Sequence, residues 1–359
     1  MSAINPILIT IGDAGCVVEK DINFYDYDGT LIASYELAEL PLSSLPDAPD
    51  HSTDDTPLTF EEYNYTLSEI NATNGKLDVG AIYNTTSGKT EAYLTMTLVS
   101  GLAPTIYFEK SDTSTLTLEL RKVSDNSLVW SATNSGSGIQ SETVSGLSEY
   151  IDYRLDTWIS TGTGTYTFGN GTSATSFITN SFDILKKVFI GNNVINLKSQ
   201  SFRAQTSLKF VSLNTNITLF DFSFIFAECY SLKCIIIPRG VTSFGGFAGN
   251  NCDSCHSLIK IILPSEITQF GTGNYAKCHS LTNMIASKDI NTIQATAFID
   301  CYSIIEYDFS NHTAIPTLSN INAFTGINDI CKIKVPSALY ASWIIATNWS
   351  TYADYIEAV

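Results

Sequence analysis

The chain has 359 residues, of which 44% are hydrophobic and 15% charged, so it holds enough apolar material for two or three packed domains and is not a disordered tail. Aromatic residues and glycines are plentiful and charged residues few, a composition that favours strands over long solvated helices. The formal net charge of −17 repels phosphate backbones, and we therefore expect no nucleic-acid partner.

The first residues predict neither export nor membrane insertion. They contain no basic stretch, and the apolar run Ile7–Ile11 follows Asn5-Pro6 and ends at Gly12. No run reaches the 18 apolar residues of a membrane span, and the C-terminal residues carry no sorting tail. We expect a chain that is made in a cytoplasm and whose eight cysteines are thiols rather than disulfides.

Residues 1–97 predict a β-rich N-terminal module. Short strands are expected at Ile7–Ile11, Ile22–Tyr27, Leu31–Tyr35, Ala81–Tyr83 and Glu91–Thr97. One helix is expected over Phe60–Asn71, where apolar residues recur with helical spacing and two glutamates suit the first turn.

The segment Asp26-Tyr-Asp-Gly-Thr resembles the first motif of haloacid dehalogenase phosphatases, in which the first Asp is the nucleophile and the second the general acid. That chemistry needs a parallel sheet with crossover helices, but a polar loop with four prolines follows Leu31. Asp28-Gly29 between two apolar pairs is also a strong hairpin signal. We interpret the motif as a β-turn and predict that the protein is not an enzyme.

A second β module is predicted over residues 98–180. Its apolar residues alternate, and Ser, Gly and Asn turns separate the segments at intervals of eight to twelve residues. The alternating residues are Leu116/Leu118/Leu120, Leu128-Val-Trp130 and Tyr166/Phe168. This pattern predicts a small β-sandwich.

A repeat of 23–26 residues fills the next part of the chain. Seven segments have apolar residues in the pattern L-x-x-L-x-L, usually with an aromatic residue six positions upstream. The apolar triplets are Leu185/Val188/Ile190, Leu208/Val211/Leu213, Leu232/Ile235/Ile237, Leu258/Ile261/Leu263, Leu281/Met284/Ala286, Ile304/Tyr307/Phe309 and Ile330/Ile333/Val335. Each unit is too short to bury its own apolar face, so stacking supplies the core. The pattern predicts a leucine-rich-repeat solenoid over residues 181–336.

The sequence of the repeats resembles the BspA-type (treponemal) leucine-rich repeat, as in Phe226-Ala-Glu-Cys-Tyr-Ser-Leu-Lys-Cys-Ile-Ile-Ile-Pro. The resemblance covers about residues 182–336 and departs from the family at Gln205 and Ile327, where the family cysteine is missing. Four cysteines, Cys229, Cys255, Cys278 and Cys301, stand three residues before the first apolar position of their repeats. We expect them to form a stacked, buried ladder of small apolar side chains.

Cys252-Asp-Ser-Cys-His256 also matches the attachment motif of c-type haem. Cys255 and His256 are ordinary repeat positions, however, because Cys278-His279 repeats them, and only Cys252 is extra. We weighed a zinc clip that includes His256 and His279, but its spacing follows the repeat rather than a tetrahedron. We predict no metal and no cofactor.

Residues 337–359 predict a cap. Pro336 stops the last strand, and a short helix with Leu339, Tyr340 and Trp343 can cover the open end of the solenoid. The expected fold is therefore mostly β, with small N-terminal β modules followed by a leucine-rich-repeat solenoid and a short helical cap.

The order of modules resembles a group of proteins encoded by gut bacteria and their phages, which share an opening like Phe24-Tyr-Asp-Tyr-Asp-Gly-Thr-Leu, a β-sandwich, BspA-type repeats and an end like Ala346-Thr-Asn-Trp-Ser. This resemblance implies a phage virion protein, a fibre or decoration subunit whose N-terminal module contacts other virion proteins and whose repeats face a host glycan or protein. We expect a homo-oligomer, with a trimer favoured because it gains avidity. The alternative is a bacterial cell-surface adhesin, which needs secretion and an anchor.

The residue between the last two apolar positions of each repeat is expected to point away from the core, because side chains alternate along a strand. These residues are Ser212, Ile236, Ile262, Ile285, Asp308 and Lys334. The three isoleucines form an outward stripe that is either a contact surface for a partner or a face covered by a loop or the preceding domain.

Overall fold

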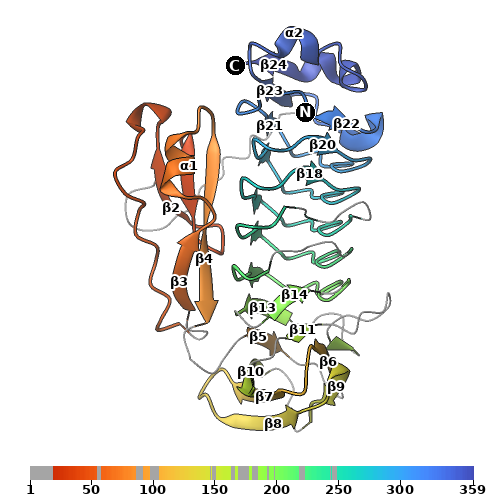
Figure 1. The fold of residues 1–359 in the computed structure, drawn as a ribbon. Coiled ribbons are helices and arrows are strands. Elements are labelled where there is room, and N and C mark those ends of the chain that lie inside the picture. Colours follow the sequence, from red (N-terminus) through yellow and green to blue (C-terminus); the bar gives the residue numbers. More distant parts are fainter. Residues whose placement is uncertain are drawn as a thin grey trace, which may run out of the picture.

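The computed structural model describes residues 19–54, 58–85, 92–97, 105–145, 147, 151–162, 166–168, 178–179, 185–191, 194–197, 199–217, 223–242, 244 and 249–359. The expected strand Ile7–Ile11 lies outside these residues. The described part is mostly β and consists of an N-terminal sheet, a two-layered sandwich and a solenoid with a helical cap (Figure 1). Within it, no helix is long and apolar enough to cross a membrane.

The N-terminal module is a four-stranded sheet with the order β2-β1-β4-β3. Its elements are β1 (Ile22–Tyr25), β2 (Leu31–Tyr35), the 3-10 helix η1 (Leu37–Glu39), β3 (Leu58–Tyr63), α1 (Leu67–Asn71) and β4 (Leu77–Thr85). β1 pairs antiparallel with β2 and parallel with β4. The predicted turn at Asp28-Gly29 is confirmed: Asp26 N donates to Thr30 O at 2.8 Å, and Gly29 has a φ of +87°.

The helix predicted over Phe60–Asn71 is wrong in its first half. Residues 58–63 form β3, which pairs antiparallel with β4, and the helix α1 begins only at Leu67. A capping box fixes this start, because Glu69 N donates to the Thr66 hydroxyl and Thr66 N donates to the Glu69 carboxylate. The helical spacing of Phe60 and Tyr63 was therefore coincidental, and pairing with β4 decided their conformation.

The second module is a sandwich of two sheets. Its strands are β5 (Ala92–Thr97), β6 (Thr105–Lys110), β7 (Thr115–Lys122), β8 (Leu128–Asn134), β9 (Gly138–Thr143), β10 (Asp152–Thr161), β11 (Tyr166–Phe168) and β12 (Ile178–Thr179). β5 pairs with β10 and with the first repeat strand, not with the N-terminal sheet. The N-terminal module therefore ends before Ala92 rather than at residue 97, because the partners of β5 lie in the sandwich and the solenoid.

The solenoid has one strand at each of the seven predicted positions. These strands are β13 (Leu185–Ile190), β15 (Phe210–Ser212), β16 (Cys234–Ile236), β17 (Lys260–Ile262), β19 (Asn283–Ile285), β21 (Glu306–Asp308) and β23 (Lys332–Val335). Further strands lie on the return segments: β14 (Val194–Leu197), β18 (Gln269–Phe270), β20 (Thr292–Ile293) and β22 (Thr317–Leu318). The coils pair in parallel in two runs, β13-β15-β16-β17 and β19-β21-β23, and β5 continues the sheet from β13 into the sandwich.

The predicted apolar triplets form one continuous core with the sandwich. The last repeat differs at its first position, where Ile330 is 69% exposed and Cys331 is buried in its place. Asn328 causes this shift, because its side chain accepts from Ile330 N while Cys331 N donates to Asn328 O.

The predicted cap at the C-terminal end is confirmed. It consists of α2 (Tyr340–Trp343), the 3-10 helix η3 (Trp349–Tyr355) and β24 (Ile356–Ala358), with the 3-10 helix η2 (Ile321–Phe324) in the coil below. Trp343 and Trp349 are buried against Phe309 of the last coils. β24 adds an unpredicted strand, which pairs in parallel with β23 and extends the sheet by one position.

Candidate functional site

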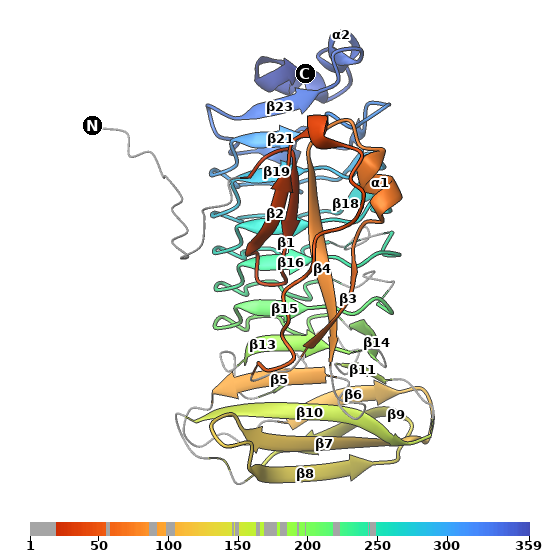
Figure 2. The same ribbon diagram turned by 90° about the vertical axis from the view of Figure 1, so that its left-hand side faces the viewer.

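The stripe predicted on the strand face of the solenoid is covered by the N-terminal sheet. Four of its members, Ser212, Ile236, Ile262 and Asp308, are buried, and Ile285 and Lys334 are partly exposed. Figure 2 shows β4 lying across the repeat strands, with its direction nearly perpendicular to theirs. Of the two alternatives for the stripe, the structure has the one in which the preceding domain covers it.

The apolar part of this contact is a small cluster of its own. It joins Tyr25 and Ile82 of the N-terminal sheet to Cys234, Ile236 and Ile262 of the solenoid. β4 has a glycine, Gly80, directly over Ile236, where an added Cβ would lie 2.3 Å from Ile236 Cγ2. The missing side chain therefore lets the two sheets approach closely.

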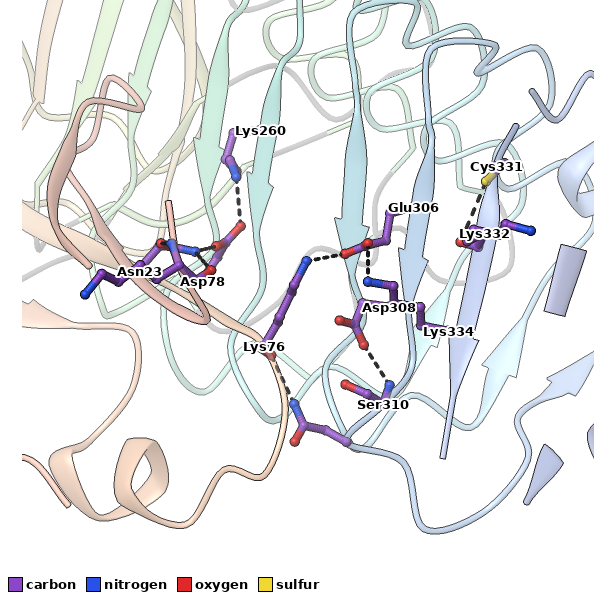
Figure 3. A network of polar contacts seen from close by, with 12 residues as sticks. Asn23, Lys76, Asp78, Lys260, Glu306, Asp308, Ser310, Cys331, Lys332 and Lys334 are labelled. Carbon is purple, nitrogen blue, oxygen red and sulfur yellow. Dashed lines mark hydrogen bonds and ion pairs between the residues drawn. The ribbon is translucent and has the colours of Figure 1, made fainter. Parts of the chain in front are cut away.

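Lys260 is the central polar residue of the contact. It extends from β17 toward the N-terminal sheet, where its Nζ lies 3.0 Å from Asp78 Oδ2 (Figure 3). The same Nζ donates to the Tyr25 hydroxyl at 3.0 Å. Asn23 donates its side-chain amide to the other oxygen of Asp78. Burial lowers the pKa of Lys260, but the carboxylates of Asp78 and Glu19 outweigh it, so the net shift is upward and the ammonium stays charged.

A second polar contact lies further toward the cap. Glu306 on β21 accepts from Lys76 of the N-terminal module and from Lys334 of the solenoid, each at 2.6 Å (Figure 3). Burial raises the pKa of Glu306, but hydrogen bonds from Lys334 and Lys76 bring it below its usual value. Asn311 adds a bond to Lys76 O at 3.0 Å. Charged pairs that are partly desolvated fix the register of a contact better than they stabilise it.

Sequence reasoning missed both polar anchors. Lys260 and Glu306 belong to a second outward column, which lies two residues before the stripe on each strand. Its members are Lys187, Phe210, Cys234, Lys260, Asn283, Glu306 and Lys332. The available signal was Lys260 itself, a lone charge between isoleucines, which is rarely buried without a partner.

The four ladder cysteines are fully buried and share one contact. Each Sγ donates to a backbone oxygen of the preceding coil, at Phe202, Phe226, Cys252 and Tyr275 in order, over 2.8–3.3 Å. The thiol is small enough for the core, and it adds a second donor to a carbonyl that already accepts a backbone N–H within its own turn. That these cysteines are reduced stays a prediction.

Cys252 is a repeat position after all. Its backbone N donates to Asn274 O, as Phe226 N and Tyr275 N donate to the equivalent oxygens of their next coils. Cys252 therefore replaces the aromatic residue of its repeat, and the ring of Phe244 stacks on Tyr275 instead. Both sulfurs of the haem-like motif are inaccessible, so the fold gives a haem no route to them.

A column of stacked rings runs beside the cysteine ladder, in the turns that precede the repeat strands. Tyr230, His256, His279 and Tyr302 stack in consecutive coils, with ring centroids 4.8, 4.5 and 4.7 Å apart. We call these four residues the ring column. Tyr230 and Tyr302 are 40% and 50% exposed, and the Tyr302 hydroxyl lies 2.8 Å from His279 Nε2. The sequence contained this signal as the residue after each ladder cysteine.

The ring column is poorly shaped for zinc. The planes of His256 and His279 are within 4° of parallel, so their in-plane nitrogen lone pairs run side by side instead of converging on one ion. Across the part of the chain that the structure describes, no three His, Cys, Asp or Glu residues are grouped to hold a metal.

The phosphatase-like motif contributes to a structural cluster. Asp26 is buried, and its carboxylate lies 2.8 Å from His51 Nε2, while His51 Nδ1 lies 2.9 Å from Asp54. Burial raises the pKa of Asp26, and the Asp26 carboxylate raises the pKa of His51 against its own burial. The pair ties the loop before β3 to the β1–β2 turn.

Stacked coils of 23–26 residues, each with one parallel strand and an inward apolar triplet, define a leucine-rich-repeat protein. Residues 167–256 and 249–342 match the family model of the BspA type leucine rich repeat region, in 6 copies. The repeat region is thus of the BspA type.

Three solved structures resemble the chain over 48% of its length. A leucine-rich repeat protein from Bacteroides ovatus has 18% identity, a TM-score of 0.39 and 42% of its own chain covered. The Treponema pallidum leucine rich repeat protein has 20% identity, a TM-score of 0.36 and 73% of its own chain covered. A leucine rich cell surface protein from Faecalibacterium prausnitzii has 18% identity, a TM-score of 0.30 and 63% of its own chain covered. The chain spans less than half the length of the first of these. No curated protein sequence matches it significantly.

Proposed function

We propose that this protein is a non-enzymatic structural subunit of a phage particle, a fibre or decoration protein that contacts a host surface glycan or protein through its repeats. In this proposal the N-terminal end contacts other virion proteins. A bacterial cell-surface adhesin is the second candidate, because BspA-type repeats alone suit both equally well. The module order, which resembles that of phage-encoded proteins, favours the first.

The observation that carries the proposal is the distribution of covered and open surfaces on the solenoid. The sandwich continues one end, the cap covers the other, and the N-terminal sheet lies on the strand face (Figures 1 and 2). The turns that carry the ring column remain exposed to solvent, and the two tyrosines of the column are partly exposed. A tyrosine side chain offers both an apolar ring and a hydroxyl. Tyrosines of this kind are typical of contact sites.

The test of the contact is binding of the full-length protein to host cells. Replacing the two exposed tyrosines together, Tyr230→Ala with Tyr302→Ala, should weaken binding about tenfold or more. The matched control is Ile345→Ala, which removes an apolar side chain that is 77% exposed on the cap. Equal binding by both variants would exclude the ring column as the contact.

The test of location is separate. Mass spectrometry of purified particles, together with antibody labelling of intact cells, distinguishes the two candidates. Recovery of the chain in particles supports the virion proposal, and recovery only on the cell surface supports the adhesin.

A further inference from the structure

The strand β8 is the free edge of the eight-stranded sheet that runs from the solenoid into the sandwich. One side of β8 pairs with β7 over residues 128–134, and no strand among the described residues pairs on its other side. Figures 1 and 2 show β8 at the extreme end of the molecule, opposite the C-terminal cap. Another strand can therefore reach it without meeting the solenoid.

This edge has a β-bulge near its start, where the register with β7 shifts between Leu120 and Arg121, but it lacks the other usual protection against strand pairing. Residues 128–134, Leu-Val-Trp-Ser-Ala-Thr-Asn, contain no charge, proline or glycine, whereas exposed edges are commonly guarded by such residues. The edge strands β3, β9 and β24 each contain at least one glutamate. The edge strands β2, β12, β14, β18, β19 and β22 are also uncharged, but each is shorter than β8, and β2 lies over the solenoid.

The core of the sandwich is incompletely closed at the same edge. Trp130 and Ala132 stand beside Leu120 and Leu118, which are fully buried, yet both are themselves only half-buried. Leu128 at the start of the strand is 50% exposed. An added strand would extend the sheet and cover these side chains with apolar surface.

We propose that β8 pairs antiparallel with β8 of a second copy of the chain, about a two-fold axis at Ser131. Ser131 is the middle residue of the strand, so this register places the bulged start of each β8 opposite the regular end of the other. Trp130 then lies opposite Ala132 of the second copy, which places a large side chain beside a small one. Main-chain hydrogen bonds continue the two sheets into one.

A second copy fits this edge for two reasons. Antiparallel pairing of one strand with itself closes after two chains, which gives a dimer in place of the trimer favoured by avidity alone. The contact also lies at the end of an elongated molecule, so the two solenoids point away from each other and the repulsion between two chains of charge −17 is small. The proposal does not depend on what the solenoid binds.

Sedimentation velocity of the full-length protein at micromolar concentration tests the pairing. The expected mass is twice 39.2 kDa. Ser131→Lys places two ammonium groups face to face across the axis and should weaken the dimer about fivefold or more. Ser350→Lys adds the same charge at the opposite end, on the exposed surface of the cap, and should leave the dimer unchanged.

Oxidation of the Ser131→Cys variant tests the register. Residues opposite each other in an antiparallel pair lie about 5 Å apart, so a covalent dimer should form on a non-reducing gel, and the Ser350→Cys variant should give none. A monomer at micromolar concentration overturns the proposal. A dimer that Ser131→Lys leaves intact while circular dichroism shows an unchanged fold also overturns it, because the copies then meet elsewhere.

Discussion

The ladder cysteines place buried polar atoms beside backbone acceptors. Each thiol donates to one carbonyl of the coil before it. Where the ladder cysteine is missing, Gln205 occupies its place, and its side-chain oxygen accepts from Leu185 N. A repeat position can thus change residue type while the backbone group beside it keeps a hydrogen bond.

His312 should make the protein less stable in acid. It is buried beside Phe309 and Trp343, and burial lowers its pKa to about 4. Because the folded-state pKa lies below the unfolded value of 6.5, its neutral form is favoured by folding at neutral pH. Stability is then lost as the pH falls from 6.5 toward 4, by about 2.5 kcal/mol at about pH 4.5.

Urea unfolding of the wild type and of His312→Leu at about pH 7.5 and about pH 4.5 measures this contribution. The difference in unfolding free energy between the two proteins should shift in favour of the variant at the lower pH. Other titrating groups act equally on both proteins and cancel. An unchanged difference would mean that His312 is accessible to protons in the folded state.

At the residue scale, the sequence predicts the burial of side chains that recur at one repeat position. It does not predict the contacts of a residue that occurs at only one place in the chain. The cysteines recur at one position of the repeat, so their burial and stacking follow from the period. Lys260 is a single departure from an apolar strand, and its partner Asp78 is 182 residues away. No local pattern links two such residues, and only the fold brings them together.

At the scale of elements, the N-terminal sheet and the solenoid fit through size as well as charge. Gly80 on β4 leaves room for Ile236 on β16, and an added Cβ would overlap the Ile236 side chain. We predict that Gly80→Ala lowers the unfolding free energy by about 1–3 kcal/mol through overpacking. Denaturant unfolding of the full chain gives the value.

The partner substitution separates overpacking from other effects. Ile236→Ala alone should cost about 2–5 kcal/mol, and the double variant should cost less than the sum of the two, because the new methyl group fills the space that is vacated. Gly136→Ala is the matched control, since its Cβ meets only the flexible end of Gln140. Strict additivity of the two changes would show that the sheets are not in contact at this point.

Element predictions held where the pattern was long and failed where it was short. Seven repeats in register located the main strand of each coil, whereas four residues at helical spacing were not enough to assign Phe60–Asn71. The boundary at residue 97 failed for a different reason. β5 pairs with β10 of the sandwich and with β13 of the solenoid, both of which follow it in the sequence. The sequence of a strand does not itself encode which sheet the strand joins.

At the scale of the whole molecule, the sandwich acts as the starting cap of the solenoid. The strand β5 pairs on one side with β10 of the sandwich and on the other with β13 of the first coil. The first coils would otherwise present an open sheet edge and an open apolar core. The sandwich and the first coils should therefore depend on each other, while coils farther along contact only their neighbours.

This dependence predicts how a defect in the sandwich spreads. Leu155 lies on β10, is fully buried and pairs with Leu94 of β5, so Leu155→Ala should cost about 2–5 kcal/mol and loosen β5. Amide hydrogen exchange should then become faster in β13, which pairs with β5, and in β15, which pairs with β13. It should stay unchanged in β21 and β23, which the C-terminal cap covers. Equally faster exchange in all coils would mean that the solenoid and the sandwich unfold as one cooperative unit. Exchange confined to the sandwich would mean that β13 holds its place without β5.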